Sequence, residues 1–253
     1  MSIEHHVSMV VRDVAFRYCT VGGDEVSTTW DRARADTVVE GHPIRIPPTF
    51  RGQKNYPGIF WASTNCRLLM YESLLELDRL WLADFDPTVV GICTQPFQLT
   101  EQSDDAHRTH VPDILLTHSD QRVTLVDVKP EHFLHEPSVR DQFEWTRSLC
   151  QEKRWRYEVF SRGDATVLRN IKMLALGRRP ERLPQKVAAK AQEELGKSTI
   201  RLGELLNRRP KSCDQTDWRV AVFTLMWSGE AQVDINRPLS ATSVLRSSKQ
   251  ERT

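Results

Sequence analysis

Two short apolar runs, each interrupted by one acid, place the strongest constraint on the fold of this chain. Residues 111–116 carry Asp113, and residues 125–129 carry Asp127. The polar stretch between them, residues 117–122, is typical of the turn of an antiparallel hairpin. A turn centred on Asp120 pairs the strands symmetrically about that residue, so the sequence predicts that Asp113 lies directly opposite Asp127.

This placement is costly, because like charges that face each other across two strands repel. The neighbouring Val, Ile and Leu side chains also predict a covered sheet, in which an ionised carboxylate needs a compensating partner. A divalent cation would offset both charges. The two-residue period of a strand puts Lys129 on the same face as Asp127, with Val128 directed into the core.

The predicted set of side chains indicates a type of chemistry. Carboxylate oxygens are ligands for Mg²⁺ or Mn²⁺ rather than Zn²⁺, and a few of them leave coordination positions for water and a phosphate oxygen. Such an ion activates water and stabilises a leaving oxygen. Lys129 would orient the water or offset charge on the phosphate. The set therefore predicts a site for phosphodiester hydrolysis.

A third acid is expected upstream. Residues 71–82 have the spacing of a helix, with Leu74, Leu77 and Trp81 on its buried face. Glu72 and Glu76 share another face of that helix, and we expect Glu72 to reach the site and Glu76 to face solvent.

The elements around these acids follow a definite order. Residues 89–93 and 95–99 together predict the first core strand, and the hairpin follows. Residues 137–152 predict a helix, and residues 156–161 a further strand. The expected succession is α-β-β-β-α-β.

These motifs resemble those of known nucleases. Pro112-Asp113, then Asp127-Val128-Lys129, preceded by Glu72, resemble the PD-(D/E)xK nuclease superfamily. Over residues 30–245 the chain is also similar to the TnsA-like endonuclease subunit of heteromeric transposases. That narrower resemblance rests on Phe60-Trp61, Tyr71-Glu72-Ser73, Leu82-Ala83-Asp84-Phe85-Asp86-Pro87, Gln95-Pro96 and Trp227-Ser228-Gly229.

The resemblance implies an α/β restriction-endonuclease-like core, with a mixed sheet flanked by helices, and a winged-helix-like C-terminal domain. It implies Mg²⁺-dependent cleavage of the non-transferred strand at transposon ends, with Mn²⁺ as a substitute. Glu72, Asp113 and Asp127 would bind metal, and Lys129 would be the catalytic lysine. The implied partners are DNA, an integrase-type transposase subunit and an ATP-dependent regulator. Another member carries Gln at the position of Asp127, which leaves the number of metal ions open.

Two domains are expected, with a boundary at the proline- and charge-rich residues 178–184. Residues 1–179 would form the nuclease domain, with its catalytic core at about 60–176, and residues 180–253 the C-terminal domain. Residues 1–150 contain 14 Lys and Arg against 22 Asp and Glu, whereas the remainder contains 21 against 12. The second half is therefore the electrostatic candidate for DNA binding, although a winged helix also binds partner proteins.

Composition narrows the class of protein. No apolar run is long enough for a membrane span and no signal peptide is evident, so a cytoplasmic location is expected. The five cysteines show no Cys-x-x-Cys spacing and predict free thiols. His107 with His110, and His132 with His135, are expected to be exposed loop residues rather than zinc ligands.

Several alternatives fit the same residues. Asp113 is also compatible with a turn or cap device, Asp127 with a salt bridge to Lys129, and Glu72 with an exposed acid in a first helical turn. At the level of function, a restriction or repair nuclease of the same superfamily fits. So does a non-catalytic DNA-binding or assembly subunit.

Overall fold

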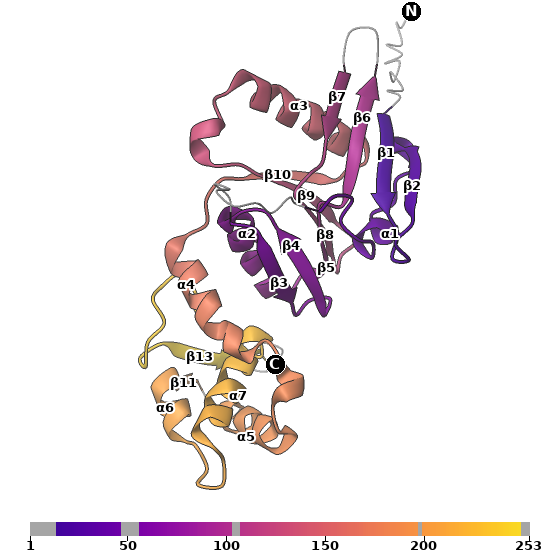
Figure 1. Cartoon of the computed structure of the whole chain (residues 1–253). Coiled ribbons are helices and arrows are strands. Elements are labelled where there is room, and N and C mark those ends of the chain that lie inside the picture. Colours follow the sequence, from indigo (N-terminus) through magenta and orange to yellow (C-terminus); the bar gives the residue numbers. More distant parts are fainter. Residues whose placement is uncertain (1–13, 47–55, 103–106, 197–198, 249–253) are drawn as a thin grey trace, which may run out of the picture.

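A computed structural model describes residues 14–46, 56–102, 107–196 and 199–248. Figure 1 shows an α/β part and a smaller, mostly helical C-terminal part, which are joined by helix α4 (Ala165–Leu174). The expected mixture of sheets and helices is confirmed. None of the helices in the described part is long and apolar enough to cross a membrane.

The central sheet carries the two acids. Its strand order is β10-β9-β8-β5, with β9 and β10 parallel and the other neighbours antiparallel. The hairpin register matches the prediction, because Ile114 pairs with Val126 and Thr117 with Val123. The strands are β5 (Val89–Thr94), β8 (Ile114–His118), β9 (Val123–Val128) and β10 (Arg156–Phe160).

A second, antiparallel sheet has the order β2-β1-β6-β7. Its strands are β1 (Val14–Cys19), β2 (Glu25–Thr29), β6 (Phe97–Gln102) and β7 (His107–His110). The prediction that residues 89–93 and 95–99 form one core strand is wrong. Gln95 has a φ of 42°, and this left-handed residue redirects the chain from β5 in the central sheet to β6 in the second sheet.

Both faces of the central sheet are covered. On one face, Leu115 and Leu125 pack with residues of the second sheet, of α1 (Ala35–Val39) and of α3 (Pro137–Glu152). On the other face, Ile114, Leu116 and Val126 pack against α2 (Leu74–Phe85) and the hairpin of β3 (Gly58–Ala62) and β4 (Arg67–Tyr71). These central side chains are at most 1% exposed, so the expected covered sheet is confirmed.

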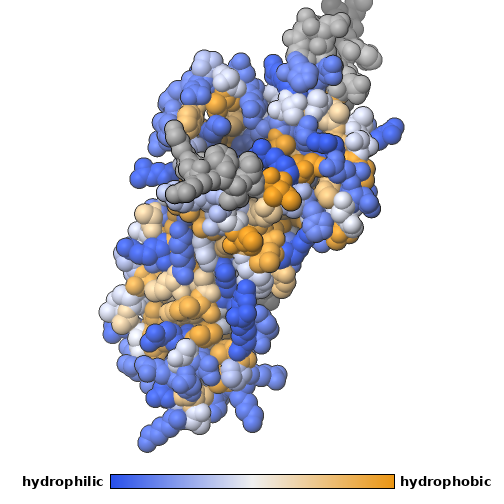
Figure 2. Space-filling model, viewed as in Figure 1, coloured by the Kyte–Doolittle hydropathy of each residue, from blue (hydrophilic) through white to orange (hydrophobic). Residues whose placement is uncertain are grey.

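Part of the visible surface is apolar. Figure 2 shows apolar residues gathered near the middle of the visible face, over the hairpin of β3 and β4. This hairpin leaves Ile59 and Leu68 66% and 68% exposed. The two side chains extend from an otherwise well-packed hairpin whose inner residues Phe60 and Leu69 are buried.

Helix α2 begins through local hydrogen bonds. The Ser73 hydroxyl accepts from the Glu76 N–H at 3.2 Å, and the Glu76 carboxylate accepts from the Ser73 hydroxyl at 2.9 Å. This reciprocal arrangement resembles a capping box. The helix ends before Asp86-Pro87, because a proline disfavours helical backbone in the residue before it.

The C-terminal part has its own core, centred on Trp218, Val222 and Leu245. Three helices surround it: α5 (Gln185–Leu195), α6 (Leu202–Asn207) and α7 (Gln215–Trp227). A small antiparallel sheet of order β11-β13-β12 joins them, formed by β11 (Ile200–Arg201), β12 (Ala231–Gln232) and β13 (Val244–Ser247). The winged-helix-like character of this part and the domain boundary at residue 179 stay predictions.

The two parts meet at Arg178. Its guanidinium carbon lies 4.6 Å from the ring centroid of Trp81 and 5.1 Å from that of Phe60. Arg179 stacks similarly on Trp61, with its guanidinium carbon 3.9 Å from the ring centroid. Both arginines therefore make cation–π contacts with the α/β part.

We expect Arg178→Met to lower the free energy of unfolding by about 1–2 kcal/mol, because it removes a partly desolvated cation–π contact while keeping most of the side-chain volume. Urea unfolding would measure the change. Arg182→Met, at an exposed position in the same connection, is the matched control and should change stability little. Equal stability of the two variants would contradict a stabilising role for the aromatic contacts.

Candidate functional site

A cavity of about 540 Å³ lies where the hairpin of β8 and β9 approaches the start of α2 and helix α3. It brings together all four residues predicted from sequence: Glu72, Asp113, Asp127 and Lys129. Among the described residues, its lining is Arg45, Glu72, Ser73, Leu75, Glu76, Thr109, His110, Val111, Asp113, Asp127, Val128, Lys129, Pro130, Phe133, Gln142 and Phe143.

Asp113 directly precedes β8, opposite the end of β9. Its Oδ2 accepts a hydrogen bond of 2.6 Å from the Val128 N–H, and its own N–H donates to the Val126 carbonyl at 3.2 Å. Burial raises the pKa of Asp113 well above its usual value, and the charges of Asp127 and Glu76 raise it further. The carboxyl group is therefore fixed where ionisation is unfavourable without a nearby positive charge.

Asp127, on β9, is 2% exposed and has partners that the sequence did not predict. His110 Nε2 lies 2.9 Å from Oδ1 and 3.0 Å from Oδ2, and the Tyr157 hydroxyl donates to Oδ2. Burial, followed by the charge of Asp127, raises the pKa of Tyr157, which keeps that hydroxyl a neutral donor. The expectation that His110 is an exposed loop residue is wrong, since it ends β7 and is 9% exposed.

Glu72 borders the cavity but does not belong to a helix. Helix α2 starts at Leu74 after the N-cap Ser73, so the prediction of a helical Glu72 is wrong. Its Oε1 lies 2.7 Å from Arg45 Nη2. This pairing differs from the exposed first-turn acid considered as an alternative.

Glu76 was expected to face solvent and is instead 6% exposed. Its Oε2 accepts from the Glu72 N–H at 2.9 Å and lies 3.4 Å from the amide nitrogen of Gln95. Burial raises the pKa of Glu76, although the hydrogen bonds from the Glu72 N–H and the Ser73 hydroxyl oppose the shift. The expected apolar face is also wrong in part, because Leu74 is 54% exposed.

Gln95 contacts two of the acids that border the cavity. It is fully buried, and its backbone N–H donates to the Asp113 carbonyl at 2.9 Å. Its side chain reaches Glu76, whereas its buried Oε1 has no hydrogen-bond partner in the described part of the chain. One left-handed residue therefore contacts the chain at both Asp113 and Glu76.

Lys129 follows β9 and lines the cavity together with Asp127. Its backbone N–H donates to the Phe160 carbonyl at 2.9 Å, which fixes the main chain. Its Nζ lies 5.9 Å from the centroid of the Phe133 ring. The ammonium group thus borders the acids without a close carboxylate partner among the described residues, unlike the alternative of a salt bridge with Asp127.

The carboxyl oxygens that border the cavity are of the type that binds a hard divalent cation. The negative charges of the neighbouring acids also raise the pKa of Asp113. Across residues 14–46, 56–102, 107–196 and 199–248, however, no group of three or more His, Cys, Asp or Glu side chains is arranged to hold a metal ion. Mg²⁺ commonly binds through one or two carboxylates, with water and substrate phosphates as further ligands. The residues fit this incomplete type of site.

Cysteine chemistry is not indicated at this site. The five cysteines are free, as predicted, and none of them lines the cavity. Burial raises the pKa of Cys93 and of Cys150 to about 12, so both thiols are protonated and poorly nucleophilic at neutral pH.

We expect Asp113→Asn to stabilise the metal-free protein near neutral pH. Below the unfolded value of 3.8, Asp113 is protonated in both states and the substitution should matter little. As the pH rises from that value towards the raised folded pKa, the wild type loses stability relative to the variant. Each unit of pKa difference corresponds to about 1.4 kcal/mol.

Urea unfolding in EDTA at about pH 4 and about pH 8 would measure this difference. Asp120→Asn is the control on the same hairpin, because a hydrogen bond from Arg122 lowers the pKa of this exposed acid. A gain in stability at high pH for Asp120→Asn but not for Asp113→Asn would contradict the analysis.

Comparison with known proteins gives one match and one negative result. Residues 86–162 match the family described as TnsA-like endonuclease N terminal. The matched segment runs from the end of α2 past β10, and it contains Asp113, Asp127 and Lys129. No curated protein matched the chain. The matched segment is therefore similar to the N-terminal domain of TnsA-like endonucleases, and its two acids and its lysine lie in one cavity.

Proposed function

We propose that this protein is a metal-dependent DNA endonuclease subunit of a cut-and-paste transposase, which hydrolyses a phosphodiester on the non-transferred strand at transposon ends. The observation that carries the proposal is the placement of Asp113, Asp127 and Lys129 in one cavity inside the matched endonuclease segment. The proposed core is of the PD-(D/E)xK type.

The proposed ligands are Asp113 and Asp127, with Glu76 as the preferred third acid. Glu76 is preferred to Glu72 because it is more deeply buried and affects the pKa of Asp113 more strongly. Mg²⁺, or Mn²⁺ in its place, would polarise the phosphodiester and lower the pKa of a water molecule. Lys129 orients that water or offsets charge that develops on the scissile phosphate.

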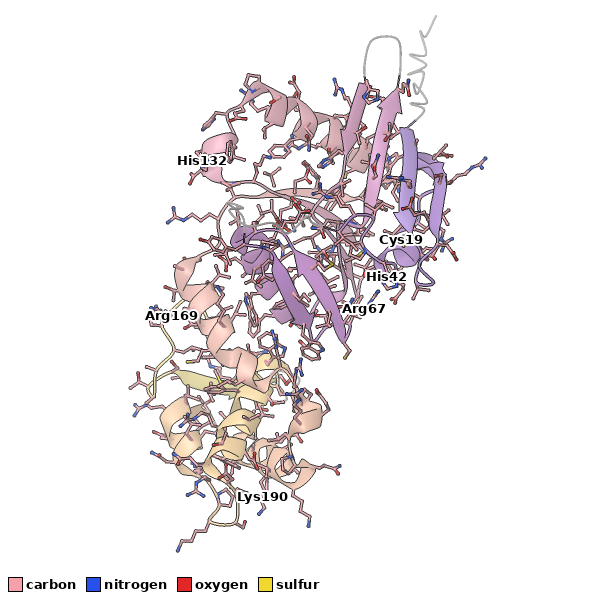
Figure 3. The ribbon with its side chains drawn as sticks, viewed as in Figure 1. Cys19, His42, Arg67, His132, Arg169 and Lys190 are labelled. Atoms are coloured by element: carbon pink, nitrogen blue, oxygen red, sulfur yellow. The ribbon has the colours of Figure 1, made fainter. Side chains whose placement is uncertain are left out.

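The proposed partners are DNA, an integrase-type transposase subunit that cuts and joins the other strand, and an ATP-dependent regulator. The C-terminal part, which we propose to be winged-helix-like, supplies exposed basic residues for DNA or for a partner. Lys190 projects from its outer end in Figure 3. Sequence-independent phosphate contacts of this kind would make binding sensitive to salt.

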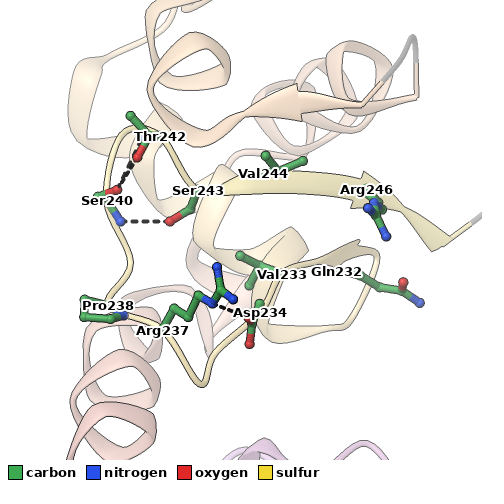
Figure 4. A pocket seen from close by; sticks show the side chains of 10 residues that line it. All are labelled: Gln232, Val233, Asp234, Arg237, Pro238, Ser240, Thr242, Ser243, Val244 and Arg246. Atoms are coloured by element: carbon green, nitrogen blue, oxygen red, sulfur yellow. Dashed lines mark hydrogen bonds and ion pairs between the residues drawn. The ribbon is translucent and has the colours of Figure 1, made fainter.

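A hollow in the C-terminal part supports DNA binding as a second function. It measures about 520 Å³ and is lined by the end of β12, by β13 and by the loop that joins them, which together place Arg237, Arg246 and three hydroxyl-bearing residues around it (Figure 4). Arg237 lies 3.5 Å from Asp234, so part of its charge is offset. A purely DNA-binding subunit would use this part and leave the acids of the cavity without a role.

A restriction or repair nuclease of the same superfamily remains the nearest enzymatic alternative. Its gene would neighbour a methylase or repair genes, whereas the proposed subunit would neighbour a gene for an integrase-type transposase. Gene neighbourhood therefore separates the two.

Asp113→Ala should weaken Mn²⁺ binding and lower the rate of DNA cleavage on the order of 1,000-fold, because a catalytic metal contributes several kcal/mol. Calorimetric titration of Mn²⁺ needs no partner, and cleavage is measured with the transposase present. Asp120→Ala, at the exposed turn of the same hairpin, should behave as the wild type. Unchanged cleavage by folded Asp113→Ala would refute the proposed site.

A second pair of variants separates the two glutamates. Glu76→Gln keeps an oxygen that accepts from the Glu72 N–H but removes the charge beside Asp113, so we expect it to weaken Mn²⁺ binding. Glu72→Gln, which removes the acid paired with Arg45, should have the smaller effect. Calorimetry on both variants tests the preference, and a larger loss in Glu72→Gln would restore Glu72 as the third acid.

A further inference from the structure

A buried hydrogen-bond network surrounds the Asp127 carboxylate. His110 from β7 contacts both oxygens, at 2.9 and 3.0 Å, and Tyr157 from β10 donates to Oδ2. Gln142 from α3 places its amide nitrogen 2.6 Å from His110 Nδ1. The network therefore joins β7, β9, β10 and α3, which belong to two sheets and a helix. His110, Asp127 and Gln142 border the cavity, whereas Tyr157 does not.

Both ring nitrogens of His110 have a partner. The Gln142 amide nitrogen lies against Nδ1, and Nε2 faces both oxygens of the Asp127 carboxylate. The network thus holds the Asp127 carboxylate between His110 and Tyr157, while Gln142 holds the other side of the His110 ring.

The donors also leave room for a ligand. A carboxylate has about four lone-pair positions. Tyr157 uses one on Oδ2, and the single Nε2 proton of His110 is shared between Oδ1 and Oδ2. Oδ1 therefore keeps accepting capacity, and Asp127 borders the cavity.

The network holds a carboxylate that is 2% exposed and that borders the cavity together with Asp113. Metal-binding carboxylates are commonly held by such outer hydrogen bonds, which fix the orientation of the ligand. The arrangement is therefore more typical of a metal-binding carboxylate held in place than of a carboxylate that serves the stability of the core.

We propose that His110 and Tyr157 are positioning residues, which hold the charged Asp127 carboxylate in the orientation that binds the divalent cation. Gln142 supports them by fixing the ring of His110. This inference rests on the proposed function, because it concerns the same cavity, but it assigns roles to residues outside the predicted acids and lysine.

Tyr157→Phe is the most direct test, since it removes a single oxygen atom and keeps the packed ring. We expect it to weaken Mn²⁺ binding by about 10- to 100-fold, as does His110→Ala. His110→Gln should recover most of the loss, because its amide nitrogen replaces the Nε2 donor. Calorimetric titration of Mn²⁺ into the full chain measures all three variants, with thermal unfolding as a check on folding.

Two control variants match the chemistry elsewhere in the fold. His118 on β8 contacts Thr88 and Thr124 and lies outside the cavity, so His118→Ala should bind Mn²⁺ as the wild type does. Tyr18→Phe removes a hydroxyl from a partly buried tyrosine in the core. If His110 had only a structural role, His110→Ala would lower the stability of the protein, and His110→Gln would not restore the affinity for Mn²⁺.

The outcomes separate the two proposals. Normal Mn²⁺ binding by folded Tyr157→Phe and His110→Ala, with binding lost in Asp113→Ala, would overturn the positioning roles and leave the metal site intact. Failure of the wild type to bind Mn²⁺, or equal binding by Asp113→Ala, would overturn the proposed metal site and the positioning roles with it.

Discussion

The pairing of β8 with β9 is the constraint on which the site depends. This register places Asp113 opposite Asp127 at the end of a sheet whose central side chains are covered on both faces. Burial of two carboxyl groups is unfavourable unless they have polar partners. Asp113 accepts from the Val128 N–H, and Asp127 contacts His110 and Tyr157. The hairpin therefore fixes both the position of the acids and the electrostatic cost that makes a cation favourable there.

The acids are supported in different ways. Asp127 contacts His110 and accepts from the Tyr157 hydroxyl, and Glu76 accepts from the Ser73 hydroxyl and the Glu72 N–H. Asp113 accepts from the Val128 N–H, while burial and its acidic neighbours raise its pKa. A raised pKa is the property expected of a carboxyl group whose charge is stabilised on binding a cation.

Sequence reasoning succeeded where the pattern is local. Symmetry about Asp120 was sufficient to predict the register, because both strands are short and apolar. The expectation that Glu76 faces solvent is wrong because Leu74 was assigned to the buried face of the helix. Ser73 and Glu76 nevertheless have the spacing of a capping box. The turn at Gln95 and the contact between His110 and Asp127 depend on two sheets packing together, and no local pattern records that.

The matched endonuclease segment does not contain the whole cavity. It begins at residue 86, whereas Glu76 and Glu72 precede it, and helix α2 ends at Phe85. Gln95, inside the segment, links the two portions, because its backbone contacts Asp113 and its side chain contacts Glu76. Glu76 is therefore brought to the cavity by the packing of α2 on the central sheet, so the position of that helix determines whether Asp113 and Asp127 have a further carboxyl group beside them.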